Sequence, residues 1–258
     1  LNRSEKTCEI VPISLLATLA LAMSVPKLTE SARVHLGAFG ICNAVPVMVG
    51  DTLRNSFEVQ DIWRNSHGNV VADTVHVLSN QRGERVFQLG KRTMFPAAVQ
   101  LRGDQMPQRN DVSPMMSVRP LLRESWTSYF PTYSSMLVNI NKRYHGEQRP
   151  LPSVGSLIAH RIVKVFDTSD TLALCNLMRL TNAHHLDKEK FSQSEILVPG
   201  PLVLAAALSN VAQDLGDILH ETWCHATNIN VVNHGDQISS VTFVVGASHV
   251  PGDQTKLG

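Results

Sequence analysis

The segment SEILVPGPLVLAAAL, residues 194–208, repeats the pattern of an earlier segment, CEIVPISLLATLALA, residues 8–22. In both, a Glu-Ile pair leads through Val-Pro into a run of leucine and alanine. The acidic residues of the two pairs, Glu9 and Glu195, are 186 positions apart. An apolar run that follows a proline is typical of a buried helix. The two segments therefore predict one apolar helix near each end of the chain.

A second pair of matching segments follows the first pair. VMVGDTLRNSFEV, residues 47–59, resembles VNHGDQISSVTFV, residues 232–244, and Asp51 and Asp236 in their Gly-Asp turns are 185 positions apart. Two landmarks that recur in the same order at nearly the same offset indicate an internal duplication. An aspartate after a glycine is a common turn residue, so we interpret both aspartates as structural.

Each unit is predicted to contain one apolar helix and several antiparallel strands. The helices are expected from Ser14 to Met23 and from Pro201 to Leu219. Segments of strand-like composition are bounded by glycine-containing connections, as in antiparallel hairpins. They cover residues 37–49, 56–65, 70–80, 85–95 and 224–232. A helix that lies on a curled antiparallel sheet is an α+β architecture.

The duplication divides the chain into three parts. Residues 1–95 are predicted to form the first unit and residues 156–258 the second. The connector between them, residues 96–155, holds seven of the 13 prolines, which is typical of a linker or a surface excursion. We expect its aromatic cluster, residues 124–133, to pack on a neighbouring surface.

Composition argues against several classes of protein. The chain is 43% hydrophobic and has a net charge of +1, so it offers no overall electrostatic attraction for nucleic acid or membranes. The basic run at 141–150 is interpreted as a solvated loop. Four cysteines without CxxC spacing disfavour a zinc ribbon or a disulfide framework. The apolar stretch from Ile10 to Val25 is too short to span a bilayer.

The order of these motifs resembles that of a known family. TNAHHLD (181–187), EILVPGPLVLAAALS (195–209) and VNHGDQI (232–238) are similar to the MaoC-like acyl-CoA hydratase/dehydratases, with the mesaconyl-CoA hydratase branch the most similar. PISLLATLALA (12–22) and MVGDTL (48–53) match the first half in the same way. The resemblance implies a double hot-dog fold, in which two central helices are each wrapped by an antiparallel sheet.

The resemblance also implies an additional helix upstream of the second central helix. In this chain it would cover residues 170–178, with Asp170 as its N-cap. The counterpart in the first unit would precede residue 1, so about 35 residues of that unit are expected to be absent from the sequence. One flank of the first central helix should then be open or covered by another surface.

In the family, an aspartate and a histidine in a D-x-N-P-x-H motif move the protons, and amides beside a glycine hold the thioester oxygen. By resemblance, His185 takes the place of the catalytic histidine, Asn182 that of the orienting asparagine and Gly200 that of the oxyanion glycine. Leu180 stands where the catalytic aspartate is expected. A general acid or base typically contributes about 10²–10⁴-fold, so its loss predicts little hydration activity.

Other residues at the predicted site weaken the enzyme hypothesis further. Ala183 replaces the usual proline, and Pro199 and Pro201 have no amide hydrogen to donate. The substitute groups at hand are His184, Asp187 and Asp170, and none has the family spacing. His185 also has a purely structural interpretation, in which it bridges loop backbone or caps a helix end.

Two functions therefore remain open. The favoured one is a catalytically inactive structural subunit of a larger mitochondrial assembly such as the mitochondrial ribosome, with other protein subunits as partners and room for an rRNA contact. The alternative is an active hydro-lyase that binds acyl-CoA and adds water across an enoyl-CoA or mesaconyl-CoA double bond; its location would be mitochondrial or otherwise cytoplasmic. Neither function requires a cofactor or a membrane. The spacing of His220, His225 and His234 fits no metal-ligand pattern, so no metal site is predicted.

Overall fold

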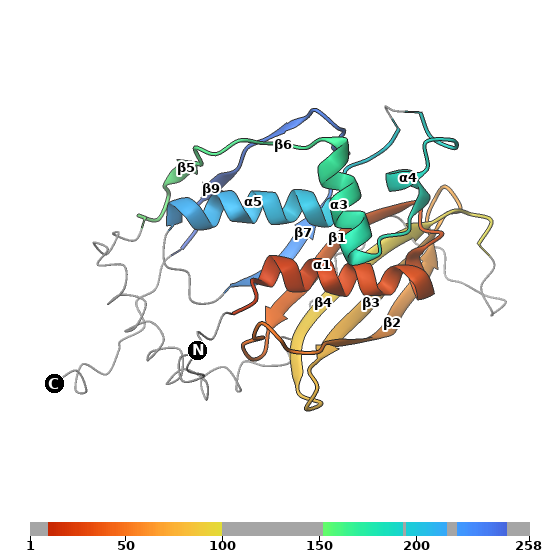
Figure 1. The fold of residues 1–258 in the computed structure, drawn as a ribbon, viewed down its shortest axis with the longest axis horizontal. Coiled ribbons are helices and arrows are strands. Elements are labelled where there is room, and N and C mark those ends of the chain that lie inside the picture. The colour runs from red at the N-terminus through yellow and green to blue at the C-terminus, as the bar shows by residue number, and fades with distance from the viewer. Residues whose placement is uncertain (1–9, 100–151, 193–194, 216–220, 247–258) are drawn as a thin grey trace, which may run out of the picture.

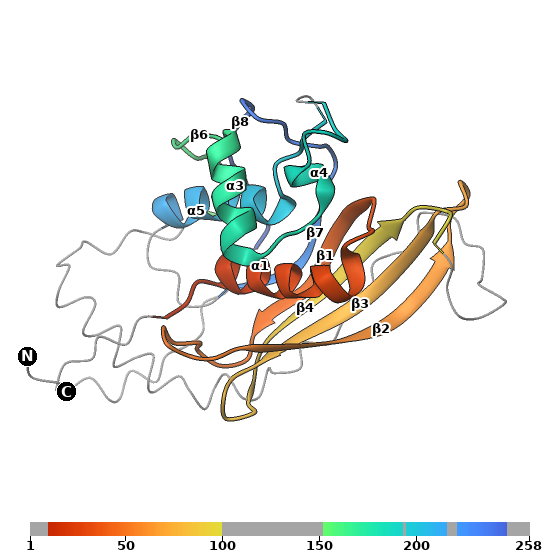
Figure 2. The same cartoon turned by 45° about the vertical axis from the view of Figure 1, so that its right-hand side comes forward.

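The computed structural model describes residues 10–99, 152–192, 195–215 and 221–246. Most of the predicted connector, including the aromatic cluster and the basic run, lies outside these residues, as do residues 1–9. Two central helices lie side by side in the described part, one from each half of the chain, with a curved antiparallel sheet beneath the first of them (Figure 1, Figure 2).

The first half is built from one apolar helix laid across four long strands. Helix α1 (Ile13–Ser24) begins after Pro12 and continues into a π-helical turn, η1 (Val25–Thr29). The strands are β1 (Val34–Asn43), β2 (Arg54–Arg64), β3 (Val70–Ser79) and β4 (Arg85–Phe95). They pair antiparallel, in the sheet order β2-β3-β4-β1. The predicted helix and four strands of this half are therefore present at nearly the predicted positions.

The core of this half forms where the leucine and alanine face of α1 meets the inward face of the sheet. Leu16 and Ala20 of the helix are fully buried against Ile41, Leu78 and Leu89 of the strands. Burial of one such side chain contributes about 1.5–3 kcal/mol, so this helix–sheet contact is the main source of stability in the first half. The same contact determines which side chains of β4 point inward, toward the helices.

The second half has shorter strands and more helices. Its elements, in chain order, are β5 (Leu157–Ala159), β6 (Lys164–Val165), α3 (Thr168–Met178), α4 (Ala183–Leu186), α5 (Gly200–Leu215), β7 (Thr222–Thr227), β8 (Gln237–Ile238) and β9 (Val241–Phe243). Strand β7 pairs with β1 and extends the four-stranded sheet to five strands. The remaining strands form two separate pairs, β5 with β9 and β6 with β8.

The second central helix departs from the prediction in one respect. Helix α5 was expected to be wrapped by a sheet of its own, but within the described residues it packs on α1 and on the short strand β8. The physical reason is strand length, because the strands of this half have two to six residues and the pairs they form are too small to curl around a helix. Among the described strands, only β7 joins the two halves into one sheet.

The predicted duplication is confirmed by hydrogen bonds that occur twice. The Val11 amide donates to the Val47 carbonyl at 2.8 Å, and the Val198 amide donates to the Val232 carbonyl at 2.9 Å. Both central helices begin at a proline carbonyl: Pro12 accepts from Leu15 and Leu16, and Pro199 accepts from Leu202 and Val203. The two helices are therefore equivalent elements of a repeated unit.

The two Gly-Asp turns are also equivalent. The Asp51 carboxylate accepts a hydrogen bond from the Met48 amide at 3.0 Å, and the Asp236 carboxylate accepts one from the Asn233 amide at 2.8 Å. The glycine before each aspartate has a positive φ, 100° and 92°, which a residue with a side chain rarely adopts. This geometry confirms that both aspartates are turn residues.

The upstream helix is present, but its predicted cap is wrong. Helix α3 begins at Thr168, and the Asp167 side chain, not Asp170, caps it by accepting from the Asp170 amide. In return, the Asp170 side chain accepts a hydrogen bond from the Asp167 amide at 3.1 Å. This reciprocal capping box satisfies two backbone donors at once, which makes the earlier aspartate the better start.

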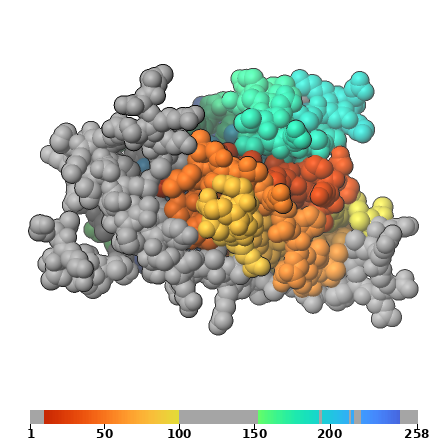
Figure 3. Space-filling model, turned by 60° about the horizontal axis from the view of Figure 1, so that its bottom comes forward, coloured from red at the N-terminus to blue at the C-terminus, as the bar shows by residue number. Residues whose placement is uncertain are grey.

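Helix α3 covers the flank of α1 that was predicted to be open or covered by another surface. Cys175 and Met178 of α3 and Leu180 beyond it form an apolar cluster with Ala22 and Val25 of the first half. Figure 3 shows the residues that follow the connector, in green and cyan, seated directly on the red and orange residues of the first half. The flank is therefore closed by the second half of the same chain. No helix within the described residues is long and apolar enough to cross a membrane.

Candidate functional site

A cavity of about 140 Å³ lies where the two halves meet. Its walls are formed by the end of α1 and η1, the start of β1, the inward face of β4, the α4 region, the first turn of α5 and the segment after β7. The three predicted site residues, His185, Asn182 and Gly200, all line it, and so does Leu180. The fold thus brings together residues from both halves that are up to 211 positions apart in the chain, as Leu21 and Val232 are.

His185 is held by the backbone of the segment that leads into α5. Its ring nitrogen Nδ1 lies 2.9 Å from the carbonyl oxygen of Leu197, so Nδ1 carries the hydrogen and donates it. Burial, together with the neighbouring His184, lowers the pKa of His185 to about 4. The two rings meet edge to face, with 4.1 Å between their centroids. At neutral pH, His185 is therefore a neutral imidazole that bridges loop backbone.

Asn182 ties the second half to the end of the first central helix. Its side-chain nitrogen donates to the Thr29 carbonyl at 2.8 Å and approaches the Glu30 carbonyl at 3.3 Å. The backbone carbonyl of Asn182 accepts a hydrogen bond from the His185 amide at 3.1 Å. With both hydrogens of the amide group directed at backbone, Asn182 positions η1 against the cavity wall.

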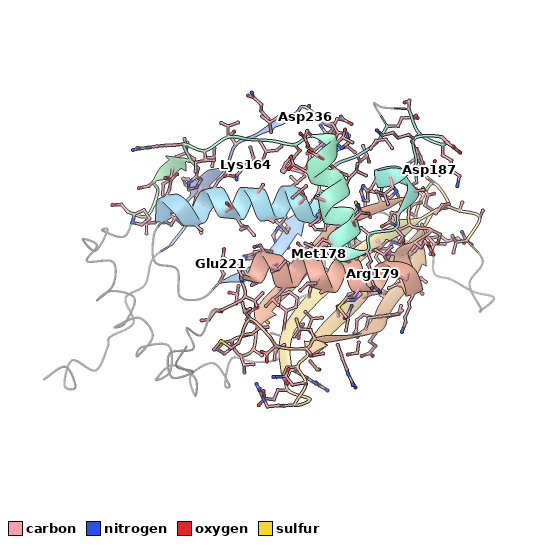
Figure 4. All side chains as sticks on the ribbon, in the orientation of Figure 1. Lys164, Met178, Arg179, Asp187, Glu221 and Asp236 are labelled. Atoms are coloured by element: carbon pink, nitrogen blue, oxygen red, sulfur yellow. The ribbon has the colours of Figure 1, made fainter. Side chains whose placement is uncertain are left out.

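Leu180 reaches the cavity because α3 ends abruptly. Arg179 adopts a left-handed conformation, with φ 57°, and the Leu180 amide bonds back to the Cys175 carbonyl at 3.0 Å. Figure 4 shows Met178 and Arg179 at the end of α3 that lies over α1. The leucine side chain is 4% exposed and belongs to the apolar cluster between α1 and α3. The expected position of a catalytic carboxylate is therefore a packed apolar position.

Gly200 begins α5 beside the cavity. The first amides of a helix lack partners within it and carry the positive end of the helix dipole. A Cβ on Gly200 would lie in ordinary contact, 3.5 Å, with the Asn228 side chain, which itself donates to the His35 carbonyl at 2.8 Å. The prolines on both sides supply no amide hydrogen, so Gly200 has the single N–H in this short stretch.

None of the described residues that line the cavity is an aspartate or a glutamate. Asp187, a candidate substitute, points away from it: its carboxylate accepts from the amides of Glu189 and Lys190 on the surface (Figure 4). Those amide hydrogen bonds lower the pKa of Asp187 below its usual range. Asp170 is occupied in the capping box of α3. Within the described chain, neither carboxylate replaces the one missing at Leu180.

Sequence reasoning missed a buried lysine in the cavity wall. Lys91 of β4 is 5% exposed, and burial lowers its pKa to about 7. Its Nζ donates to the hydroxyls of Ser24 and Thr29, each at 3.3 Å. Strand periodicity gave a signal, because Lys91 shares the inward face of β4 with Phe87 and Leu89. A lysine at an apolar position of a strand is an exception that needs an explanation.

Two more polar residues of the first half line the same cavity. Thr93, two positions beyond Lys91, is 2% exposed, and its hydroxyl oxygen has no hydrogen-bond partner among the described residues. His35 of β1 places Nε2 at 2.7 Å from the Gly37 carbonyl, and burial together with the charge of Lys91 lowers its pKa to about 3. No sequence pattern marked either residue.

His225 and His234 lie in separate parts of the described structure. His234 lies beside α3, with Nε2 at 2.9 Å from the Thr171 hydroxyl, whereas His225 is an exposed residue of β7 that stands opposite Phe39. His220 lies outside the described residues. Across the ranges that the structure covers, no three metal-binding side chains are grouped closely enough to hold an ion.

Comparison with known proteins identifies the fold. A conserved hypothetical protein from Mycobacterium tuberculosis, described as having a double hotdog fold, matches 95% of this chain with 72% of its own length, at a TM-score of 0.72 and 18% identity. A Chloroflexus aurantiacus protein described as a MaoC domain dehydratase matches 94% of this chain with 69% of its own, at a TM-score of 0.73 and 19% identity. No protein-family model matches the chain, and no curated protein is similar to it in sequence. The chain therefore has the predicted α+β double hot-dog fold.

Proposed function

We propose that this chain is a MaoC-like hot-dog protein that has lost hydratase activity and serves as a structural subunit of a larger assembly. One observation carries the proposal. The cavity that holds His185, Asn182 and Gly200 is lined by no carboxylate among the described residues, and Leu180 occupies the place of the expected one.

The chemistry of hydration explains why a cavity without a carboxylate argues against hydratase activity. Water must lose a proton to a base, and the α-carbon must receive one from an acid. His185 has a pKa of about 4, so at neutral pH it cannot serve as the acid and is a weak base. An adjacent carboxylate would stabilise the protonated ring and raise this pKa. Without it, the retained histidine is left with the backbone contact to Leu197.

The size of the cavity supports the same conclusion. Ligand pockets usually have volumes of about 300–1,000 Å³. The 140 Å³ available here lies below this range. Apolar side chains from both halves, Leu21, Val25 and Leu180 among them, close the space.

A structural role is supported by apolar surface on the second half. Several large apolar side chains there are more than half exposed, which suits a surface that packs against other subunits. They are Val154, Leu157, Val165, Leu177, Ile229, Val231, Val241, Phe243 and Val245. Other protein subunits are the proposed partners. That the assembly is mitochondrial, such as the mitochondrial ribosome, follows from the family resemblance and is part of the same proposal.

Hydration assays test the proposal directly. The purified chain is mixed with crotonyl-CoA and with mesaconyl-CoA, and loss of the conjugated thioester absorbance is followed. We expect no rate above that of buffer. Turnover by the unmodified protein that is abolished by His185→Ala would overturn the proposal. In parallel, the tagged chain is purified from its own cells; recovery within a large complex is expected, and recovery as copies of itself alone would contradict the structural role.

An active hydro-lyase remains the second candidate because of one residue, Lys91. Its pKa of about 7 suits a group that exchanges protons near neutral pH, and it lines the same cavity as His185. If the chain is an enzyme, turnover in the assay above should disappear in Lys91→Met and in His185→Ala alike. Loss in His185→Ala alone would assign the chemistry to the family histidine without the lysine.

A further inference from the structure

We propose that the cavity binds a short-chain carboxylate, whose oxygens pair with Nζ of Lys91 and the hydroxyl of Thr93. The inference rests on the proposed function to the extent that the ligand is bound and not converted. It adds a ligand that the loss of hydratase activity does not itself require.

The first argument is the charge of Lys91. Two neutral hydroxyls, Ser24 and Thr29, are its hydrogen-bond partners, and among the described residues no carboxylate forms an ion pair with it. An ammonium group removed from water costs several kcal/mol unless an opposite charge accompanies it. An anionic ligand in the cavity would supply that charge and return the lysine to its protonated form.

The second argument is independent of the lysine. The Thr93 hydroxyl is buried without a partner, although buried hydroxyls nearly always make a hydrogen bond. Thr93 follows Lys91 by two residues on β4, so both side chains are on the inward face of the strand and both line the cavity. One carboxylate can accept from an ammonium and a hydroxyl at the same time.

The other titratable groups around the cavity do not compete for this ligand. His35 and His185 have pKa values of about 3 and about 4, so they are neutral above pH 5. Burial also lowers the pKa of His184, and His76, on the neighbouring strand, has a pKa of about 3. Arg33 is an exposed cation at the rim of the cavity. The field inside is therefore positive, and its source is Lys91.

Size and polarity of the remaining walls define the class of ligand. A cavity of about 150 Å³ holds a molecule the size of benzene. At 140 Å³, this one accepts about six non-hydrogen atoms. Leu21, Val25, Leu180 and Val203 provide apolar contacts for a hydrocarbon chain. A four-carbon monocarboxylate such as butyrate or crotonate matches both requirements.

Calorimetric titration of the full chain with sodium butyrate at pH 6.5 tests the inference. We expect saturable binding that weakens at least about tenfold in Lys91→Met and about threefold or more in Thr93→Val, which removes the hydroxyl and keeps the shape. Lys164→Met is the matched control, because Lys164 (labelled in Figure 4) is an exposed cation of β6 that does not line the cavity, and it should bind as the unmodified chain does. Circular dichroism confirms that each variant is folded.

Butyramide, a neutral ligand of the same shape, separates charge from size and should bind at least about tenfold more weakly than butyrate. Equal binding of the two, equal binding of butyrate by Lys91→Met, or no binding of butyrate would each overturn the inference. Tight binding of butyryl-CoA together with no binding of butyrate would also overturn it, by assigning the cavity to the thioester. The hydration assay is separate, so bound butyrate with hydratase activity would reject the loss of activity and keep the ligand.

Discussion

Nδ1 of His185 lies 2.9 Å from the carbonyl oxygen of Leu197, three residues before the first residue of α5. The contact fixes the tautomer of the ring and attaches the α4 segment to the start of the second central helix. In the proposed function it is the present role of a histidine whose carboxylate partner is a leucine.

His185→Ala should lower the free energy of unfolding by about 1–3 kcal/mol, because the partly buried Leu197 carbonyl would lose its donor. His185→Asn should lower it less, since an asparagine side-chain nitrogen can take the place of Nδ1. Urea unfolding at pH 7 measures both. Equal stability of the alanine variant and the unmodified chain would show that the contact contributes nothing.

Leu180→Asp should introduce a measurable rate of crotonyl-CoA hydration into a chain that has none. The carboxylate would enter the position from which the family motif supports its histidine, and it should raise the pKa of His185. The readout is the hydration rate from pH 5 to pH 8.

Leu180→Asn is the matched control for that variant, because it is equally polar and of the same size but carries no charge. Both variants should be less stable by about 2–5 kcal/mol, since Leu180 is packed among Ala22, Val25 and Met178. A rate in the asparagine variant equal to that in the aspartate variant would show that charge is not the missing element.

Lys91→Met should make the chain more stable at pH 7, by about 1–4 kcal/mol, because it removes a buried cation that no carboxylate accompanies. The pKa of Lys91 is lowered from 10.5 in the unfolded chain to about 7 in the folded one. Between these values the unfolded state binds more protons, so the stability of the unmodified chain should rise as the pH rises from about 7 to 10.5.

Denaturant unfolding at pH 7, 8 and 9 checks both statements. In Lys91→Met, the part of the rise that belongs to the lysine should be absent. Greater stability of the unmodified chain at pH 7 would mean that its hydroxyl contacts compensate for the burial of the charge.

Acidification should destabilise the chain below pH 6.5. His35 and His76 have pKa values of about 3, and His185 of about 4, against 6.5 when unfolded. As the pH falls, the unfolded state takes up protons first, so the stability present above pH 6.5 is lost progressively toward pH 3–4. Each such histidine contributes up to about 1.4 kcal/mol per pH unit.

His76→Gln tests this mechanism, because glutamine can replace the hydrogen bonds to Thr74 and Asn55 but does not titrate. The change in unfolding free energy between pH 6 and pH 5 should be smaller in this variant by about the contribution of one histidine. An unchanged slope would place the acid sensitivity elsewhere.

Gly90→Ala should destabilise the first half by about 1–3 kcal/mol or more, because a Cβ at this position of β4 would overlap the ring of Phe39 on β1. Phe39→Leu should relieve part of the overlap. In a double-mutant cycle measured by urea unfolding, the two changes together should therefore cost less than the sum of their separate costs. Additive costs would show that the ring does not lie over the glycine.

The composition of the first half was sufficient to predict its elements. A run of leucine and alanine after a proline gave α1, and a strand-like segment after a glycine-containing connection gave β4 at its observed bounds. The internal repeat related the two Gly-Asp turns before any contact was known. These features are local, so each is determined by the order of residues along a short stretch of chain.

The lack of an acid group at position 180 was also determined by sequence, because that residue is a leucine whatever its surroundings. The cap of α3 was not, since Asp167 and Asp170 are both good cap residues and the reciprocal hydrogen bonds decide between them. The packing of α3 against α1 could not be predicted from the sequence either, because the two helices are more than 140 positions apart in the chain.

Only the tertiary structure determines which residues line the cavity. Lys91 and Thr93 come from a strand of the first half, and Leu180, His185 and Gly200 come from loops and helix ends of the second. No local pattern relates them, because their proximity depends on β7 pairing with β1 and on α3 packing against α1. Sequence alone gave a leucine at the position where the family resemblance implies a carboxylate; the burial that gives Lys91 its lowered pKa and leaves the Thr93 hydroxyl unpaired exists only once both halves have closed around the same space.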